Sequence, residues 1–197
     1  DRIRATSLAD IAKEPELFSF AMAGGRSAFQ TNCMQCHGAG GAGSHGFPNL
    51  VDDDWIWGGS LEQIRATIEH GIRNADDKSR QSMMPRFGVD GMLTGAQIAA
   101  VTDYVLSLSG KAQATPEGTQ IFQEQCAACH GPDGKGNQEL GAPSLADGIW
   151  LYGGNRDAIY RSIFYARNGS MPPWAGRLDE ATIKMLTIYV HALGGGR

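Results

Sequence analysis

Apolar residues recur at the spacing of a helix face, and the same arrangement occurs once in each half of the chain. In both copies a glycine, a phenylalanine and a cysteine follow one another at steps of four: Gly25, Phe29 and Cys33, then Gly118, Phe122 and Cys126. Steps of four keep side chains on one face of a helix. A glycine on that face lets a second helix approach closely, because it has no side chain. The pattern predicts a first helix in each half that packs against a partner helix.

A second helical pattern lies near the end of each half. Thr94 and Gln97 form a capping-box sequence before the first copy, and Asp179 is the expected N-cap of the second. Both copies then carry the same apolar face: Ile98, Val101, Tyr104, Val105 and Leu108, then Ile183, Leu186, Tyr189, Val190 and Leu193. We expect each of these helices to be the partner of the first helix in its own half.

The segments between the helices repeat as well. Residues 46–59 correspond to residues 141–154 in the order of their residue types. Such sustained self-similarity predicts two tandem all-α domains of one design. Gly110 is a helix stop and Pro116 is a helix start. We therefore expect a lead-in segment at 1–23, domains at 24–110 and 117–197, and a linker at 111–116.

Each first helix ends in a Cys-x-x-Cys-His run, which is the attachment signature of a c-type haem. Two thiols one helical turn apart reach both vinyl groups of the porphyrin, and the adjacent imidazole supplies an axial nitrogen. The residues are Cys33, Cys36 and His37 in the first attachment motif, and Cys126, Cys129 and His130 in the second. A redox dithiol or a zinc ribbon is the alternative for Cys-x-x-Cys alone. The histidines and the lack of a second cysteine pair in either copy argue against both. The sequence predicts two covalently bound haem c groups.

A methionine followed by proline precedes the last helix of each half, at Met84 and Met171. Methionine is the usual ligand opposite histidine in a low-spin cytochrome c. Core filling is the common role of a methionine, but the matched pairs favour ligation. We expect Met84 to serve the haem of the first half, with Met83 as the alternative, and Met171 to serve that of the second. His70 lacks a histidine counterpart, so we expect a surface or structural role for it.

Further groups are candidates for the surroundings of the haems. The carbonyls near Pro48 and Pro143 are expected to accept the second N–H of each histidine and to orient its ring. Four aromatic residues are candidates for the haem edge and its propionates, with ordinary core packing as the alternative: Trp55, Trp57, Trp150 and Tyr152. Three arginines are candidate counter-charges, with plain surface exposure as the default: Arg65, Arg156 and Arg161. The charged stretch 72–82 is expected to be a solvated loop, with docking as the alternative.

Composition narrows the class of partner and the compartment. The chain has 197 residues and a formal net charge of −4, which disfavours a nucleic-acid partner. All four cysteines lie in the two attachment motifs, so none remains for a structural disulfide. No stretch approaches the roughly 20 apolar residues of a membrane span, and no signal-peptide pattern opens the chain. Because bacteria attach haem c outside the cytoplasmic membrane, we expect a mature or truncated product whose targeting or anchoring segment is missing.

Taken together, the two attachment motifs, the Met-Pro pairs and the tyrosine-containing last helices resemble the class I cytochrome c fold. Several segments more narrowly resemble the dihaem subunit of cbb3-type cytochrome c oxidases: residues 46–50, 52–59, 134–143, 150–154 and 171–174. The resemblance covers nearly the whole chain from about Leu17. It departs in the first half, where a longer loop precedes Met84 and Arg86-Phe87 replaces the Pro-Trp of the second half.

The resemblance implies an electron-transfer role. In that family an N-terminal membrane anchor precedes two periplasmic haem domains, which pass single electrons to the catalytic core of a respiratory terminal oxidase. For this chain it implies other oxidase subunits and a soluble donor cytochrome as partners, and a place on the periplasmic side of the bacterial inner membrane. It implies no catalysis by the chain itself. The alternatives are a free periplasmic dihaem carrier similar to cytochrome c4, and a dihaem peroxidase or gas sensor, which needs an open position on one iron.

Overall fold

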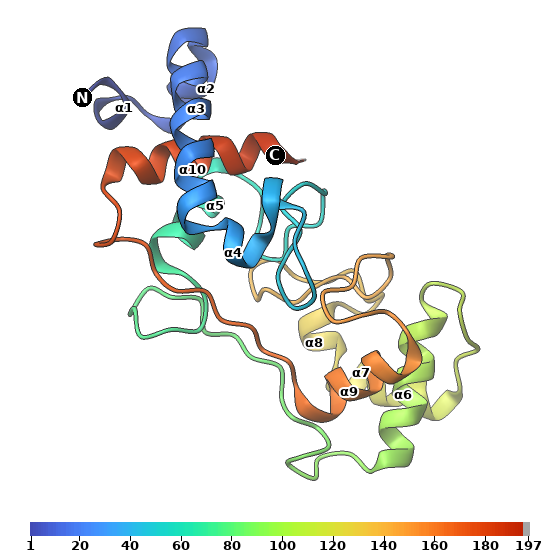
Figure 1. Cartoon of the computed structure of the whole chain (residues 1–197). Coiled ribbons are helices and arrows are strands. Elements are labelled where there is room, and N and C mark those ends of the chain that lie inside the picture. The colour runs from blue at the N-terminus through green and yellow to red at the C-terminus, as the bar shows by residue number, and fades with distance from the viewer. Residues whose placement is uncertain (195–197) are drawn as a thin grey trace. The chain divides into compact units, whose positions relative to one another are not determined.

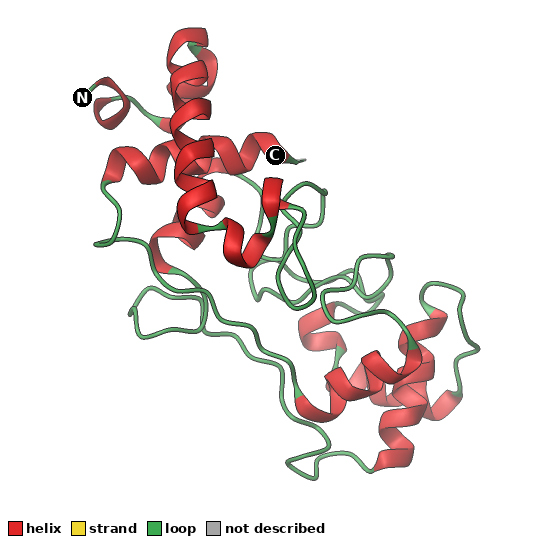
Figure 2. Cartoon of the chain, viewed as in Figure 1, coloured by secondary structure: helices red, strands yellow, loops and turns green. Residues whose placement is uncertain are grey.

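The computed structural model describes residues 1–194, in which all regular secondary structure is helical (Figure 2). Within this range the extended segments form only isolated bridges, so no strand is present. The described residues confirm the predicted all-α class. They divide into two compact units. Unit 1 combines Asp1–Gln81 with the described residues from Gly169 onward, and unit 2 is Ser82–Asn168.

Unit 1 contains the first attachment motif and the last helix of the chain. Its helices are α1 (Arg2–Ala5), α2 (Leu8–Lys13), α3 (Pro15–Asn32), α4 (Met34–His37), a 3₁₀ turn at Ala39–Gly41, α5 (Leu61–His70) and α10 (Glu180–Leu193). The side chain of Asp179 accepts hydrogen bonds from Ala181 N and Thr182 N, which confirms the predicted N-cap of α10. Ser60 and Gln63 form a capping box at the start of α5.

The crossing of α3 and α10 forms the centre of unit 1 (Figure 1). A Cβ atom added to Gly25 would lie 2.2 Å from the Met185 carbonyl oxygen and 2.6 Å from Tyr189 Cβ, so only glycine permits this approach. The ring centroids of Phe29 and Tyr189 are 5.5 Å apart. The surrounding core consists of Phe29, Ile64, Ile68, Ile183, Leu186, Tyr189 and Val190.

The lead-in helices α1 and α2 also pack in unit 1. Together with the first half of α3 they form a cluster that includes Ile188 of α10, with Ile3, Leu8, Ile11, Leu17 and Ala21. The ammonium of Lys184, on α10, is almost fully buried and donates to the carbonyl oxygens of Arg4 at 2.6 Å and Thr6 at 3.0 Å. Because α3 already begins at Pro15, no boundary separates the predicted lead-in at 1–23 from the rest of the unit.

Unit 2 is a second, contiguous helical unit built around the second attachment motif. Its helices are α6 (Gly95–Ser107), α7 (Pro116–Gln125), α8 (Ala127–His130) and α9 (Arg156–Tyr165). Thr94 and Gln97 form the predicted capping box of α6. At the crossing of α6 and α7, a Cβ atom on Gly118 would lie 2.3 Å from the Ala100 carbonyl oxygen. The core consists of Phe87, Ile98, Val101, Val105, Leu106, Ile121, Phe122, Ile159 and Ile163.

The helix partners and the domain boundaries differ from those predicted. The first helix of the first half, α3, packs on the last helix of the second half, α10. The last helix of the first half, α6, packs on α7 of the second half. The expected linker at 111–116 therefore joins two helices inside unit 2, and the predicted domains 24–110 and 117–197 each contribute to both units. The predicted pairing was wrong because both first helices carry the same contact face, and so do both last helices.

Candidate haem sites

Each attachment motif occupies a single turn that continues from the first helix. Cys33 ends α3 and precedes α4, and its carbonyl oxygen accepts from Cys36 N at 3.1 Å and His37 N at 3.0 Å. Cys126 does the same for Cys129 N at 3.1 Å and His130 N at 2.9 Å. This turn places the two thiols of each motif on neighbouring positions, as attachment to one porphyrin edge requires.

The first thiol of each motif is less easily ionised than the nucleophile of a reactive dithiol. All four cysteines are free. Burial raises the pKa of the Cys33 thiol to about 11, and the same cause raises the pKa of Cys126 to about 11. Catalytic dithiols have a lowered pKa, because the thiolate is the nucleophile. The raised pKa of Cys33 and Cys126 therefore argues against the redox-dithiol alternative.

Both motif histidines are oriented by a main-chain carbonyl, as the sequence predicts. His37 Nδ1 lies 3.1 Å from Pro48 O, and His130 Nδ1 lies 3.0 Å from Pro143 O. Burial lowers the pKa of both imidazoles, while the carbonyl contact opposes this shift. With a proton on Nδ1 donated to the carbonyl, Nε2 of each ring retains a lone pair. A neutral imidazole held in this tautomer is a suitable axial ligand for iron.

The carbonyls are positioned by a tight loop after each motif. Gly43 N donates to His37 O at 2.7 Å, and Gly136 N donates to His130 O at 2.8 Å. Both glycines have positive φ, at 72° and 84°, and an added Cβ would lie within 3.0 Å of the loop main chain. The loop therefore returns close enough for the carbonyl to reach the ring.

Each candidate methionine ligand lies in the unit that contains the attachment motif of the other half of the sequence, whereas we expected it beside the motif of its own half. Met171 is in unit 1, where it pairs with Ile72, and the following Trp174 packs on the core cluster that Cys33 also contacts. Met84 is in unit 2, where it packs on the cluster that Cys126 contacts. The first attachment motif thus shares a unit with the methionine of the second half, and the second motif shares one with the methionine of the first half.

Neither alternative ligand, Met83 or His70, lies where an iron ligand is expected. Met83 is 65% exposed, whereas Met84 is partly buried against the core of unit 2. His70 Nδ1 lies 3.2 Å from Asp76 Oδ1, and the pKa of Asp76 is lowered, first by a hydrogen bond from the Lys78 main chain and then by His70. His70, the last residue of α5, thus contacts the charged loop that follows the helix, as expected for a surface or structural role.

Two partly buried tryptophans each have a buried N–H group that is free to bind a cofactor. The indole Nε1 atoms of Trp55 and Trp150 are buried and have no hydrogen-bond partner among the described residues. Each ring packs on a glycine, Gly59 or Gly154, whose added Cβ would lie within 3.0 Å of it. A buried N–H without an acceptor is costly in a folded protein. A haem propionate is an acceptor of the right chemistry, so the orphaned indoles fit a haem in both units.

The arginines proposed as counter-charges have carboxylate partners instead. Arg156 contacts Asp103, Arg161 contacts Asp157, and Arg65 contacts Glu69 and Glu180. Two other arginines lie over the remaining candidate aromatics. Arg80 is 5.0 Å from the ring centroid of Trp57, and Arg167 is 5.3 Å from that of Tyr152. The sequence did not predict this arrangement. Trp57 and Tyr152 occupy matching positions in the two halves, but Arg80 and Arg167 do not.

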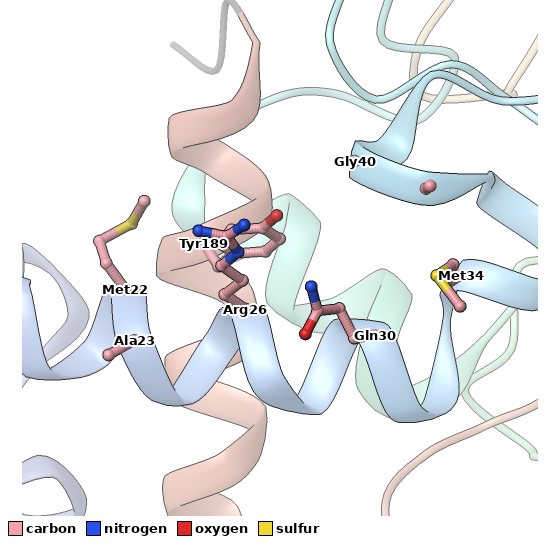
Figure 3. Close-up of a pocket in the computed structure, with 8 residues that line it drawn as sticks. Met22, Ala23, Arg26, Gln30, Met34, Gly40 and Tyr189 are labelled. Carbon is pink, nitrogen blue, oxygen red and sulfur yellow. The ribbon is translucent and has the colours of Figure 1, made fainter.

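A pocket of about 360 Å³ lies beside the first attachment motif (Figure 3). Figure 3 shows Met22, Ala23, Arg26 and Gln30 along one helix, with Tyr189, Met34 and Gly40 from neighbouring elements. None of the cysteine or histidine residues of the motif lines this pocket, so we assign it no part in holding the cofactor.

Two further features are absent from the described residues. No group of three or more His, Cys, Asp or Glu residues in residues 1–194 could hold a free metal ion. Among the same residues, no helix combines the length and the apolar character that a membrane crossing needs.

Comparison with known proteins agrees with this geometry. The family model for cytochrome c matches residues 22–109, and that for cytochrome c oxidase, cbb3-type, subunit III matches residues 113–190. The cbb3-type cytochrome c oxidase subunit CcoP of Cereibacter sphaeroides is 53% identical over 195 residues, covering 97% of this chain and 67% of the relative. The chain belongs to this family of cbb3-type oxidase subunits.

Other relatives carry the related name FixP. The cbb3-type cytochrome c oxidase subunit FixP of Azorhizobium caulinodans is 56% identical over 194 residues, covering 96% of this chain and 66% of the relative. That of Bradyrhizobium diazoefficiens is 52% identical over 197 residues, covering 98% and 68%. The chain thus spans about two thirds of the length of these members of the CcoP/FixP family. The matches also confirm two cytochrome c domains in the sequence, although the helices of those domains are exchanged in space.

Proposed function

We propose that the chain carries two covalent haem c groups and relays single electrons to the catalytic core of a cbb3-type terminal oxidase. The observation that carries the proposal is the repeated set of groups suited to a haem: two free thiols on one turn, an oriented neutral histidine, a methionine loop and an orphaned indole N–H in each unit. The names of the relatives support the oxidase as partner.

The ligand pairs follow from the two units rather than from the two sequence repeats. His37 and Met171, with thioethers from Cys33 and Cys36, would hold the haem of unit 1. In unit 2, the haem would be held by the remaining four residues: Cys126, Cys129, His130 and Met84. Bound in this way, the iron supplies one-electron oxidation and reduction.

The residues around each iron are suited to electron transfer rather than to bond chemistry. A carbonyl fixes each histidine, and hydrogen bonds fix the main chain of each methionine, so the same residues would hold the iron in both oxidation states. A substrate would first have to displace a methionine. We therefore propose a non-catalytic subunit on the periplasmic side of the inner membrane, reduced by a soluble cytochrome.

The exchanged ligand pairs can be tested by removing one haem at a time. In a Cys126→Ser/Cys129→Ser background only the haem of the first motif remains. Adding Met171→Ala should abolish the sulfur-to-iron charge-transfer band, and adding Met84→Ala should leave it. The Cys33→Ser/Cys36→Ser background should give the reverse. Ligation within each sequence repeat would give the opposite result in both backgrounds.

The function itself is tested on the intact chain. The mass in denaturant should exceed that of the polypeptide by two haems, and the reduced protein should bind carbon monoxide negligibly. Rapid stoichiometric uptake of carbon monoxide would favour the peroxidase or sensor alternative. Failure to associate with the other subunits of the oxidase would favour the free carrier similar to cytochrome c4.

A further inference from the structure

The two candidate methionine ligands are held by different means. In unit 1, Ile72 N donates to Met171 O at 3.0 Å and Met171 N donates to Ile72 O at 2.9 Å, as in an antiparallel pair. The half-buried side chain of Asn74 adds a bond from Nδ2 to Met171 O at 2.8 Å. Met171 is therefore fixed by main-chain pairing, with a side chain in support.

Met84 has no comparable main-chain partner among the described residues. Its main chain is held instead by one side chain, that of Asn168. Met84 N donates to Asn168 Oδ1 at 3.1 Å, and Asn168 Nδ2 donates to Met84 O at 3.2 Å. A carboxamide carries both an acceptor and a donor, so it reproduces the two bonds that Ile72 makes in unit 1.

The segment that carries Asn168 is itself fixed close to the methionine loop. It follows α9, which ends at Tyr165 and is capped by Ala166 with a positive φ of 52°. Phe164 O accepts from Gly88 N and Val89 N, both at 3.2 Å. An added Cβ on Gly88 would lie 2.2 Å from the Phe164 ring, so the two segments are in close contact. The end of α9 and the segment after it therefore contact the Met84 loop at two points, at Gly88–Val89 through Phe164 and at Met84 through Asn168.

We propose that Asn168 is a positioning residue for Met84 as the sixth ligand of the haem in unit 2. This inference rests on the proposed function, because it presupposes that Met84 binds the iron. Loss of the Asn168 amide removes both bonds to the main chain of Met84, whereas loss of the Asn74 amide leaves the main-chain pair of Met171 intact. The two asparagines thus form a matched test and control.

The experiment follows the pH at which methionine leaves the iron, using the charge-transfer band. In a Met171→Ala background the remaining band reports Met84 alone. There, Asn168→Ala should increase the methionine-detached fraction about tenfold, which lowers the midpoint by about one pH unit. Asn168→Asp keeps the acceptor but not the donor and should give an intermediate shift. In the Met84→Ala background, Asn74→Ala should change the fraction less than about threefold.

The outcomes separate this inference from the proposed function. If the Met171→Ala background shows no band, Met84 is not a ligand and the proposed function fails at this site. If the band is present and Asn168→Ala leaves its midpoint unchanged, the proposed function stands and the positioning role is overturned. Equal shifts for Asn168→Ala and Asn74→Ala would also overturn it. They would show that Met84, which lacks main-chain pairing, depends on its asparagine no more than Met171 does. Haem content and far-ultraviolet circular dichroism confirm that each variant is folded.

Discussion

Arg156 illustrates how the partner of a residue decides its role. From the sequence it is a candidate counter-charge for a propionate. In unit 2 its guanidinium instead makes two parallel bonds to Asp103, Nε to Oδ1 at 2.8 Å and Nη2 to Oδ2 at 3.0 Å. This bidentate pair joins α9 to α6. Its contribution is to the stability of the unit rather than to the cofactor.

The pair gives unit 2 a pH-dependent contribution to stability. The Arg156 side chain lowers the pKa of Asp103 by hydrogen bonding and by its charge. A lowered pKa stabilises the fold above the ordinary value of about 4, and the contribution is lost as pH falls through the folded value. Asp103→Asn should therefore cost about 0.5–1 kcal/mol at pH 7 and clearly less at about pH 3. Urea unfolding at both pH values checks this, and an equal cost at both would contradict it.

Residues whose role is set by a local motif could be predicted, and those set by distant contacts could not. The bonds from His37 and His130 to the carbonyls of Pro48 and Pro143 follow from the attachment motif and the repeated loop after it. Asn168 gave no such signal. Its role depends on which methionine loop lies beside the end of α9, and that is decided by the pairing of the helices.

At the scale of elements, the two crossings of helices share one design. Gly25 on α3 and Gly118 on α7 each lie against a main-chain carbonyl of the partner helix. The sequence predicted the glycines, the faces and the caps, but could not predict the partners. Both first helices present a glycine, a phenylalanine and a cysteine, and both last helices present the same apolar face. Pairing within or between the halves satisfies the pattern equally well.

A methyl group at the α3–α10 crossing should separate the helices. Alanine is favoured over glycine in a helix by about 1 kcal/mol. At Gly25, however, the added Cβ would lie 2.2 Å from the Met185 carbonyl oxygen, and main chain cannot move without shifting α10. Gly25→Ala should destabilise unit 1 by about 1–3 kcal/mol, measured by thermal unfolding.

A matched control for this change lies in unit 2. An added Cβ on Gly148 would have no atom within 4 Å, so Gly148→Ala should have little effect. A Gly25→Ala variant as stable as the wild type would show that α3 and α10 do not cross so closely in solution.

At the scale of the molecule, each half of the sequence contributes to both units. A cut in the loop between α6 and α7 would therefore leave two fragments, each of which contains parts of both units. We expect a protease site inserted between the exposed residues Gln113 and Ala114 to be cleaved without separation of the fragments. The cleaved protein should co-elute in gel filtration and come apart only in denaturant.

The same cut distinguishes the exchanged arrangement from two independent domains. If each repeat folded on itself, the fragments would be joined only by the loop and would separate after cleavage. The uncleaved protein with the same insertion is the control. Its haem spectrum should match that of the wild type, because the insertion lies in an exposed connection.

The exchange of helices also fixes the order in which the two units are completed during synthesis. The first attachment motif emerges early, but its unit lacks Met171 and α10 until nearly the last described residue has been added. Unit 2 is contiguous and closes earlier, although its motif emerges later. At ordinary rates of synthesis, Cys33 and Cys36 wait about ten to thirty seconds for their unit to close. The first of the two attachment motifs to be synthesised therefore lies in the last of the two units to be completed.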